Sequence, residues 1–193
     1  MASFEERIAE DRQLVRSALL DREAFAELYH RNVTPVYRYL YRQVGNLQDT
    51  EDLVSVTFRK AIESLDRYKA DVTFTTWLFG IARHTLRDHQ RASRVRDRQA
   101  AGSLESKDSL TDPAPQPDAK VMQLERLELL NMLVAKLPTD QREALLMRMS
   151  GDLRTREIAQ VMGRSEAAVK MLIHRAVLAL RASYAPYTEE IPR

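Results

Sequence analysis

The chain has 193 residues, of which 44% are hydrophobic and 30% charged, with a net charge of +2 and no cysteine. This length allows one or two domains with a hydrophobic core, and the lack of cysteine excludes disulfides and thiolate metal sites. No apolar run reaches the roughly 18 residues of a membrane span, and the polar start is unlike a signal peptide, so we expect a cytoplasmic protein without membrane insertion.

The composition favours an all-α fold, because alanine, leucine, arginine and glutamate dominate while there are only 5 glycines. Apolar residues recur at helical spacing over 4–20 and 22–44, and Pro35 either bends the second helix or starts a new one. We expect a break at 46–48 and then a helix over 49–68, whose first turn carries acidic residues where negative charge is favourable.

A basic helical segment follows and ends near residue 98. Thr73 or Thr75 is expected to cap it, and from residue 83 to 98 it has six arginines against two aspartates. Arginines at four-residue spacing share one helix face, and with neighbouring aromatic rings they suit single-stranded nucleic acid. The alternative is a solvated arginine face with Trp77 in the core. For Trp77 we favour the core, and for the arginines we favour nucleic acid.

The composition changes at residues 99–120, which contain three prolines and few core-forming residues. We expect a flexible linker there, between a first helical domain over 1–98 and a second over 121–183, with a short tail over 184–193. Leucines repeat at helical steps after residue 121, and Pro138 suits the start of another helix.

Residues 155–174 predict a helix-turn-helix. Ala159 is small where two helices cross, Gly163 suits a left-handed turn, and Ser165 suits the N-cap of the second helix. Residues 151–182 also carry six basic against three acidic side chains, a local excess that favours phosphate binding. The alternative is a helical hairpin that never contacts DNA.

Nothing in the sequence indicates an enzyme, a metal site or a cofactor. His84 and His89 are five residues apart and do not share a helix face, and catalytic or phosphate-binding fingerprints are missing. We therefore expect no catalytic residues, no metal ligands and no cofactors.

Four segments in order resemble a known family: AFAELYHRNVTPVYRYLYRQVGN, DTEDLVSVTFRKAIESLDRY, FTTWLFGIARHTLRDHQR and the stretch from LPTDQREALL to HRAVLALR. They resemble the extracytoplasmic-function (ECF) group of bacterial sigma-70 family RNA polymerase sigma factors. The resemblance implies a promoter-specificity subunit that binds core RNA polymerase and promoter DNA, with an anti-sigma factor as a further partner that the sequence does not identify.

The resemblance also implies roles for three sets of residues. The residues that match the polymerase-docking helix are Asp49, Glu51, Asp52, Leu53 and Phe58, with Leu53 and Phe58 partly in the core. The residues that match the −10 and strand-opening surface are Trp77, Arg83, His84, Thr85, Arg87, Arg91 and Arg94, with 83–85 where the family places a loop that traps a flipped base. The residues that match the −35 surface are Arg164, Ser165, Glu166, Ala168, Lys170, Met171, His174 and Arg175.

The chain departs from the family pattern at several of these positions. His84 replaces a usual asparagine, and Ser55-Val56 replace a usual Gln-Glu pair in the docking helix. Arg154 stands where a serine cap is usual, and the recognition helix has Ala168, Met171 and Leu172 where Thr, Ser and Arg are common. The −35 sequence therefore does not carry over from the family.

Two other classes of protein stay open on the sequence. A stand-alone helix-turn-helix transcriptional regulator would bind duplex DNA without polymerase and would need only the second domain. An all-α adaptor would bind protein alone and would show no salt-dependent affinity for DNA.

Overall fold

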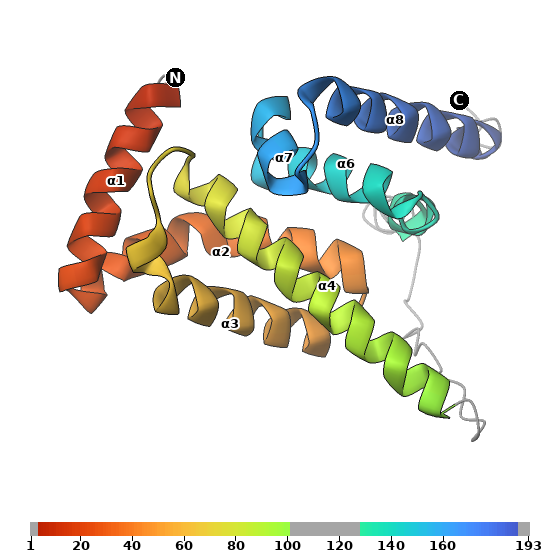
Figure 1. The fold of residues 1–193 in the computed structure, drawn as a ribbon. Coiled ribbons are helices and arrows are strands. Elements are labelled where there is room, and N and C mark those ends of the chain that lie inside the picture. Colours follow the sequence, from red (N-terminus) through yellow and green to blue (C-terminus); the bar gives the residue numbers. More distant parts are fainter. Residues whose placement is uncertain (1–3, 101–127, 189–193) are drawn as a thin grey trace, which may run out of the picture.

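The computed structural model describes residues 4–100 and 128–188, and the secondary structure of these residues is helical (Figure 1). This confirms the all-α fold. A helical stretch at 128–135 precedes α6. The elements are α1 (Phe4–Leu20), α2 (Arg22–Val44), α3 (Leu47–Glu63), a 3-10 turn (Leu65–Arg67), α4 (Phe74–Ala100), α6 (Thr139–Gly151), α7 (Thr155–Met162) and α8 (Glu166–Thr188).

Local capping explains where α2 and α3 begin. The Asp21 carboxylate accepts the backbone N–H of Glu23 at 2.9 Å, and the Asn46 side chain accepts that of Asp49 at 2.8 Å. The break expected at 46–48 is shorter and earlier, since it comprises Gly45 and Asn46 and α3 already starts at Leu47. Pro35 lies inside one continuous α2 and starts no new helix.

The start of α4 is fixed by two side chains from outside the helix. The hydroxyl of Thr73 accepts the backbone N–H of Thr76 at 3.3 Å, which selects Thr73 over Thr75 as the cap. Asp11 of α1 accepts the backbone N–H of Phe74 at 2.7 Å. Burial raises the pKa of Asp11, and this hydrogen bond partly offsets the rise. From this point α4 runs without interruption for 27 residues.

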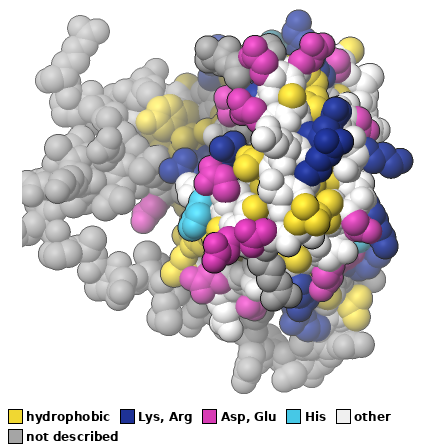
Figure 2. Space-filling model, turned by 90° about the vertical axis from the view of Figure 1, so that its left-hand side faces the viewer, with side chains coloured by type: hydrophobic (Ala, Val, Ile, Leu, Met, Phe, Trp, Pro, Cys, Tyr) yellow, Lys and Arg dark blue, Asp and Glu magenta, His cyan; other side chains and the backbone are white. Residues whose placement is uncertain are grey.

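The α1 side of the molecule carries charges of both signs. Figure 2 looks onto this side and shows basic and acidic side chains interspersed, with small hydrophobic patches between them. A face of this kind lacks the single-signed field that a nucleic-acid backbone favours. The candidate nucleic-acid surface therefore lies on other elements.

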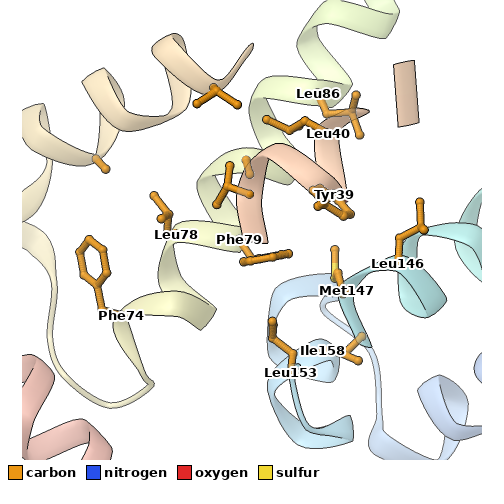
Figure 3. Packing of buried hydrophobic residues seen from close by; sticks show 14 of the residues in the cluster. Tyr39, Leu40, Phe74, Leu78, Phe79, Leu86, Leu146, Met147, Leu153 and Ile158 are labelled. Atoms are coloured by element: carbon orange, nitrogen blue, oxygen red, sulfur yellow. The ribbon is translucent and has the colours of Figure 1, made fainter. Parts of the chain in front are cut away.

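The two halves of the chain pack against each other. A single hydrophobic cluster joins residues of α2, α3 and α4 to residues of α6, α7 and α8. Figure 3 shows Tyr39 and Phe79 facing Met147, Leu153 and Ile158, and all five are essentially buried. The sequence predicted two domains but not this contact, because helical periodicity shows which face is apolar and not which partner covers it.

The expected linker and the expected tail both lie partly outside the described residues. Residues 99 and 100 end α4, and the rest of the expected linker, 101–120, lies outside the described residues, as does the expected start of the second domain near residue 121. α8 continues to Thr188, into the segment expected as a tail at 184–193. None of the helices in the described ranges has the length and apolar character needed to cross a bilayer.

Candidate nucleic-acid interface

The helix-turn-helix has the predicted geometry. Gly163 ends α7 with a φ of +64°, and the next N–H, from Arg164, donates to the carbonyl of Ala159 at 3.0 Å. The Ser165 hydroxyl accepts the backbone N–H of Ala168 at 3.2 Å and so caps α8. Val169 is completely buried in the shared core, so the outer face of α8 is held in a fixed orientation.

The predicted −35 residues lie together on that outer face. Seven of the eight are exposed and Ala168 is half-buried. Arg164 is also ion-paired with Asp140 of α6, which orients its guanidinium beside the turn. Leu172, by contrast, packs against the core, as its apolar character predicts. The result is an open surface at the N-terminal half of α8 with cationic Lys170 and Arg175.

Arg83 and Thr85, predicted for base capture, are not free in this structure. Residues 83–85 lie in the middle of α4, so the expected loop at these positions is wrong. The Thr85 side chain is buried. His84 is exposed and sits 3.0 Å from Asp88, one helical turn later. Of these three side chains, only that of His84 faces solvent freely.

Arg83 is held by a carboxylate from the second half of the chain. Its Nε donates to Glu143 of α6 at 2.8 Å, and a terminal nitrogen donates to the carbonyl of Val161 at 3.2 Å. The residue Glu143 is only 1% exposed. Burial, with Glu143 nearby, raises the pKa of Tyr39, which therefore stays a neutral phenol in the same interface.

A second buried carboxylate, Glu157 of α7, lies at the start of α4. The hydroxyls of Thr73 and Thr76 each lie 3.0 Å from its Oε1. Its other oxygen accepts the backbone N–H of Arg154 at 2.8 Å, which caps α7 without the usual serine. A guanidinium nitrogen of Arg7 lies 3.7 Å away. Glu157 thus ties α4 and α1 to the helix-turn-helix.

Three further arginines of α4 point outward. Arg87, Arg91 and Arg94 are exposed and line a cleft of about 480 Å³ between α4 and the start of α6. Arg87 Nε is 3.6 Å from Glu143, which forms part of the lining of this cleft. Trp77 is partly buried between the rings of Tyr68 and Phe74, with both centroids 5.5 Å away, so the structure supports the core interpretation for it.

An apolar groove of about 850 Å³ runs between α2 and α3. Tyr29 and Phe58, with ring centroids 4.7 Å apart, both line it, and Ile62, also in the lining, is 55% exposed. The residues that line the groove are Phe25, Ala26, Tyr29, Val33, Tyr37, Glu51, Val54, Ser55, Phe58, Arg59, Ile62 and Glu63. Exposed apolar surface that lies between polar side chains is typical of a protein-binding site.

The predicted docking residues divide into three groups. Glu51 and Asp52 are exposed, and Glu51 lines the groove with Phe58. Leu53 is core. Asp49 is engaged by Asn46, whose amide donates to it at 2.8 Å, and by His89 at 3.6 Å, so in this structure it orients Asn46, the cap of α3, and braces α4.

Sequence reasoning missed two kinds of functional residue. The α2 side of the groove was overlooked, although Tyr29 and Val33, one turn apart on an amphipathic helix, could have indicated it. Glu143 and Glu157 were overlooked because a glutamate in a helix ordinarily faces solvent. Within residues 4–100 and 128–188, no group of three potential metal ligands comes together.

Comparisons with known proteins match both halves of the chain. Residues 28–96 match the model of Sigma-70 region 2, and residues 127–180 match that of Sigma-70, region 4. The ECF RNA polymerase sigma factor SigC of Mycobacterium tuberculosis is 32% identical over 85% of this chain and 83% of its own length. BldN of Streptomyces coelicolor, also an ECF RNA polymerase sigma factor, is 34% identical over 82% of this chain, and that match spans 59% of BldN.

A solved structure shares the arrangement of helices. CnrH, in complex with the cytosolic domain of CnrY, superposes with a TM-score of 0.69 at 25% identity, covering 91% of this chain and 97% of CnrH. The likeness therefore extends across both halves of the described fold.

Proposed function

Because this chain belongs to the ECF group of sigma-70 family RNA polymerase sigma factors, non-enzymatic subunits that bind core polymerase and recognise promoters, we propose how its parts divide this work. The first domain, 1–98, docks on polymerase and holds the opened −10 strand. The second, 121–183, reads the −35 duplex. The segment 99–120 joins the two across the polymerase, in the cytoplasm.

The strand-holding role falls to α4. Arg87, Arg91 and Arg94 present three exposed guanidinium groups along one helix, a spacing that suits successive phosphates of one strand. His84, exposed on the same helix, is placed to meet a base beside them. Arg83, which Glu143 holds in this structure, joins this surface once the second domain moves away from it.

The −35 role falls to the outer face of α8. Its N-terminal half is exposed and cationic, which is how a recognition helix enters a major groove. Lys170 and Arg175 are the side chains placed to contact phosphates or base edges, and the Ser165 end of the helix is placed to approach the backbone.

The α2–α3 groove is the polymerase-docking site in this proposal. Its apolar base supplies the affinity, and Glu51, Arg59 and Glu63 at its margin supply the orientation. We also propose that a partner protein such as an anti-sigma factor can hold the chain, as the CnrH structure contains a complex with the cytosolic domain of CnrY.

The observation that carries the proposal is that one chain joins an exposed recognition helix, an arginine-lined helix and an apolar docking groove. The test begins by sequencing genomic DNA retained by the complex of this chain with core polymerase. Run-off transcription from those sites should depend on adding the chain. A chain that forms no stable complex with core polymerase, yet binds duplex DNA alone, would instead be the stand-alone helix-turn-helix regulator.

Replacing Lys170 by alanine should weaken promoter binding and reduce its salt dependence. Loss of one phosphate contact lowers the slope of log affinity against log salt by about 1 and weakens all promoters nearly uniformly. Fluorescence anisotropy of the polymerase complex on a retained promoter, measured at several salt concentrations, gives both quantities. Lys136→Ala removes an equal charge from an exposed site of the same domain, outside the predicted −35 residues, and should leave the slope unchanged. Equal slopes for the two variants would show that Lys170 does not contact the DNA.

A further inference from the structure

We propose that α8 selects thymine in the −35 duplex through an apolar pair of side chains, Ala167 and Met171. The inference rests on the proposed −35 role of α8. Thymine carries a 5-methyl group, which is the apolar feature among the hydrogen-bond donors and acceptors that the major groove displays. Contact with that methyl group ties promoter choice to A·T pairs at fixed positions of the −35 element.

The apolar pair lies on the side of α8 that faces away from the protein. Val169 is completely buried in the core, and it is two positions from each member of the pair, a rotation of about 200°. Ala167 and Met171 are four residues apart, so they are neighbours on the opposite face. Both are exposed, Met171 to 49%. Among the described elements α8 packs on α6 and α7 (Figure 1), which leaves the apolar pair open to a ligand.

Cationic side chains flank the apolar pair on both sides. Lys170 and Arg175 are exposed, and a rotation of about 100° per residue places them on opposite sides of Met171. This pattern suits a helix in the major groove, because the phosphate backbones run along the sides of the groove and the base edges form its floor. A surface that binds protein needs no cation on each flank. The charges therefore favour DNA as the occupant and place the apolar pair toward the bases.

The start of α8 holds the apolar pair at a fixed height above the groove. The Ser165 hydroxyl accepts the backbone N–H of Ala168 at 3.2 Å, and Leu172 packs against the core. Ala167 lies in the first turn, where its single methyl group lets the helix backbone approach the bases. Met171 lies one turn later, and its unbranched thioether adapts its shape to an apolar group. The two side chains together suit a small methyl group.

The apolar pair favours thymine because it has little to offer the other groups in the groove. The alanine side chain has no polar atom, and the thioether sulfur of methionine is a weak acceptor. A donor or acceptor of a base edge that lost water against this surface would remain unpaired, which is costly. A thymine methyl group loses water without that cost. Selection therefore combines attraction to the methyl group with a penalty for the alternatives.

The test removes the methyl group from the DNA and the thioether from the protein. Deoxyuridine pairs as thymine does and lacks only the 5-methyl group. On a promoter retained by the complex of the full chain with core polymerase, each thymine of the segment protected near −35 is replaced by deoxyuridine, one at a time. Competition binding to that complex gives the affinity of each duplex. A thymine between the −35 and −10 regions, outside the protected segments, is replaced as the DNA control.

The protein variants test whether the methyl effect acts through Met171. Met171→Ala is compared with Met149→Ala, which removes the same side chain from α6 at the same 49% exposure. Met171→Leu keeps an apolar side chain of similar volume. Because both methionines are exposed, the variants should fold, and circular dichroism checks this.

We expect deoxyuridine at one or two positions of the protected segment to weaken binding about fourfold each, as loss of one buried methyl group predicts. The control replacement should have no effect. Met171→Ala should weaken binding to the thymine duplex and remove the difference between thymine and deoxyuridine. Met171→Leu and Met149→Ala should keep that difference.

Equal affinity for thymine and deoxyuridine duplexes throughout the protected segment would overturn the proposal, as would a methyl effect that Met171→Ala leaves unchanged. Protected −35 segments that share no A·T pair would also overturn it. If Met171→Ala weakened binding to core polymerase and deoxyuridine had no effect, the apolar pair would be a protein contact and the proposal would be wrong. Failure of the proposed function looks different, because the complex would then protect no segment near −35 with either base.

Discussion

Ile62→Asp should weaken the affinity of the chain for core RNA polymerase by at least about thirtyfold, corresponding to the roughly 2 kcal/mol of an interface hot spot. Ile62 is 55% exposed at the edge of the α2–α3 groove. A carboxylate there meets an apolar contact surface and has to be desolvated in the complex. Since the side chain is exposed in the free chain, the fold itself should tolerate the change.

The measurement is a titration of labelled chain with core polymerase. Leu20→Asp on α1 makes the same chemical change at a residue that is 92% exposed and lies outside the groove, and it should bind normally. If Leu20→Asp weakened binding and Ile62→Asp did not, polymerase would dock on the α1 side and the groove would need another explanation.

Arg87→Ala should impair promoter opening more than promoter binding. Arg87 is exposed on the strand-binding side of α4, so its loss removes a contact that forms when the −10 strand separates. We expect a reduction in open complex of about tenfold, with duplex retention nearly unchanged, from the roughly 1–3 kcal/mol that a charge-assisted contact provides.

The appropriate control is Arg16→Ala on the exposed face of α1, which removes an equal charge. Both variants are compared for open complex by permanganate reactivity and for retention by gel shift. Equal effects on both readouts, or an effect of Arg16→Ala as large as that of Arg87→Ala, would contradict the assignment of α4 to strand opening.

Features fixed by local chemistry could be predicted from the sequence. Gly163 and Ser165 define the helix-turn-helix because a left-handed turn and an N-cap each depend on a few consecutive residues. Four-residue spacing predicted the shared face of Arg87 and Arg91 in the same way, although Arg83, at the same spacing, is only 12% exposed. The family match of both halves confirms the function that these patterns indicated.

Features made by distant residues could not be predicted. Glu143 meets Arg83 across 60 residues of sequence and Glu157 meets Thr76 across 81, and no local pattern marks a glutamate as buried. Thr85 was predicted for DNA and is buried, because the periodicity of α4 does not show that its inner face packs in the core. The groove was half predicted, since the α3 side was identified and the α2 side with Tyr29 was not.

Permanganate footprinting of a retained promoter, with core polymerase and the unsubstituted chain, tests the central division of labour most directly. The account predicts reactive thymines near −10 together with protection near −35, both dependent on the chain. Protection near −35 without reactive thymines in the presence of polymerase would contradict it.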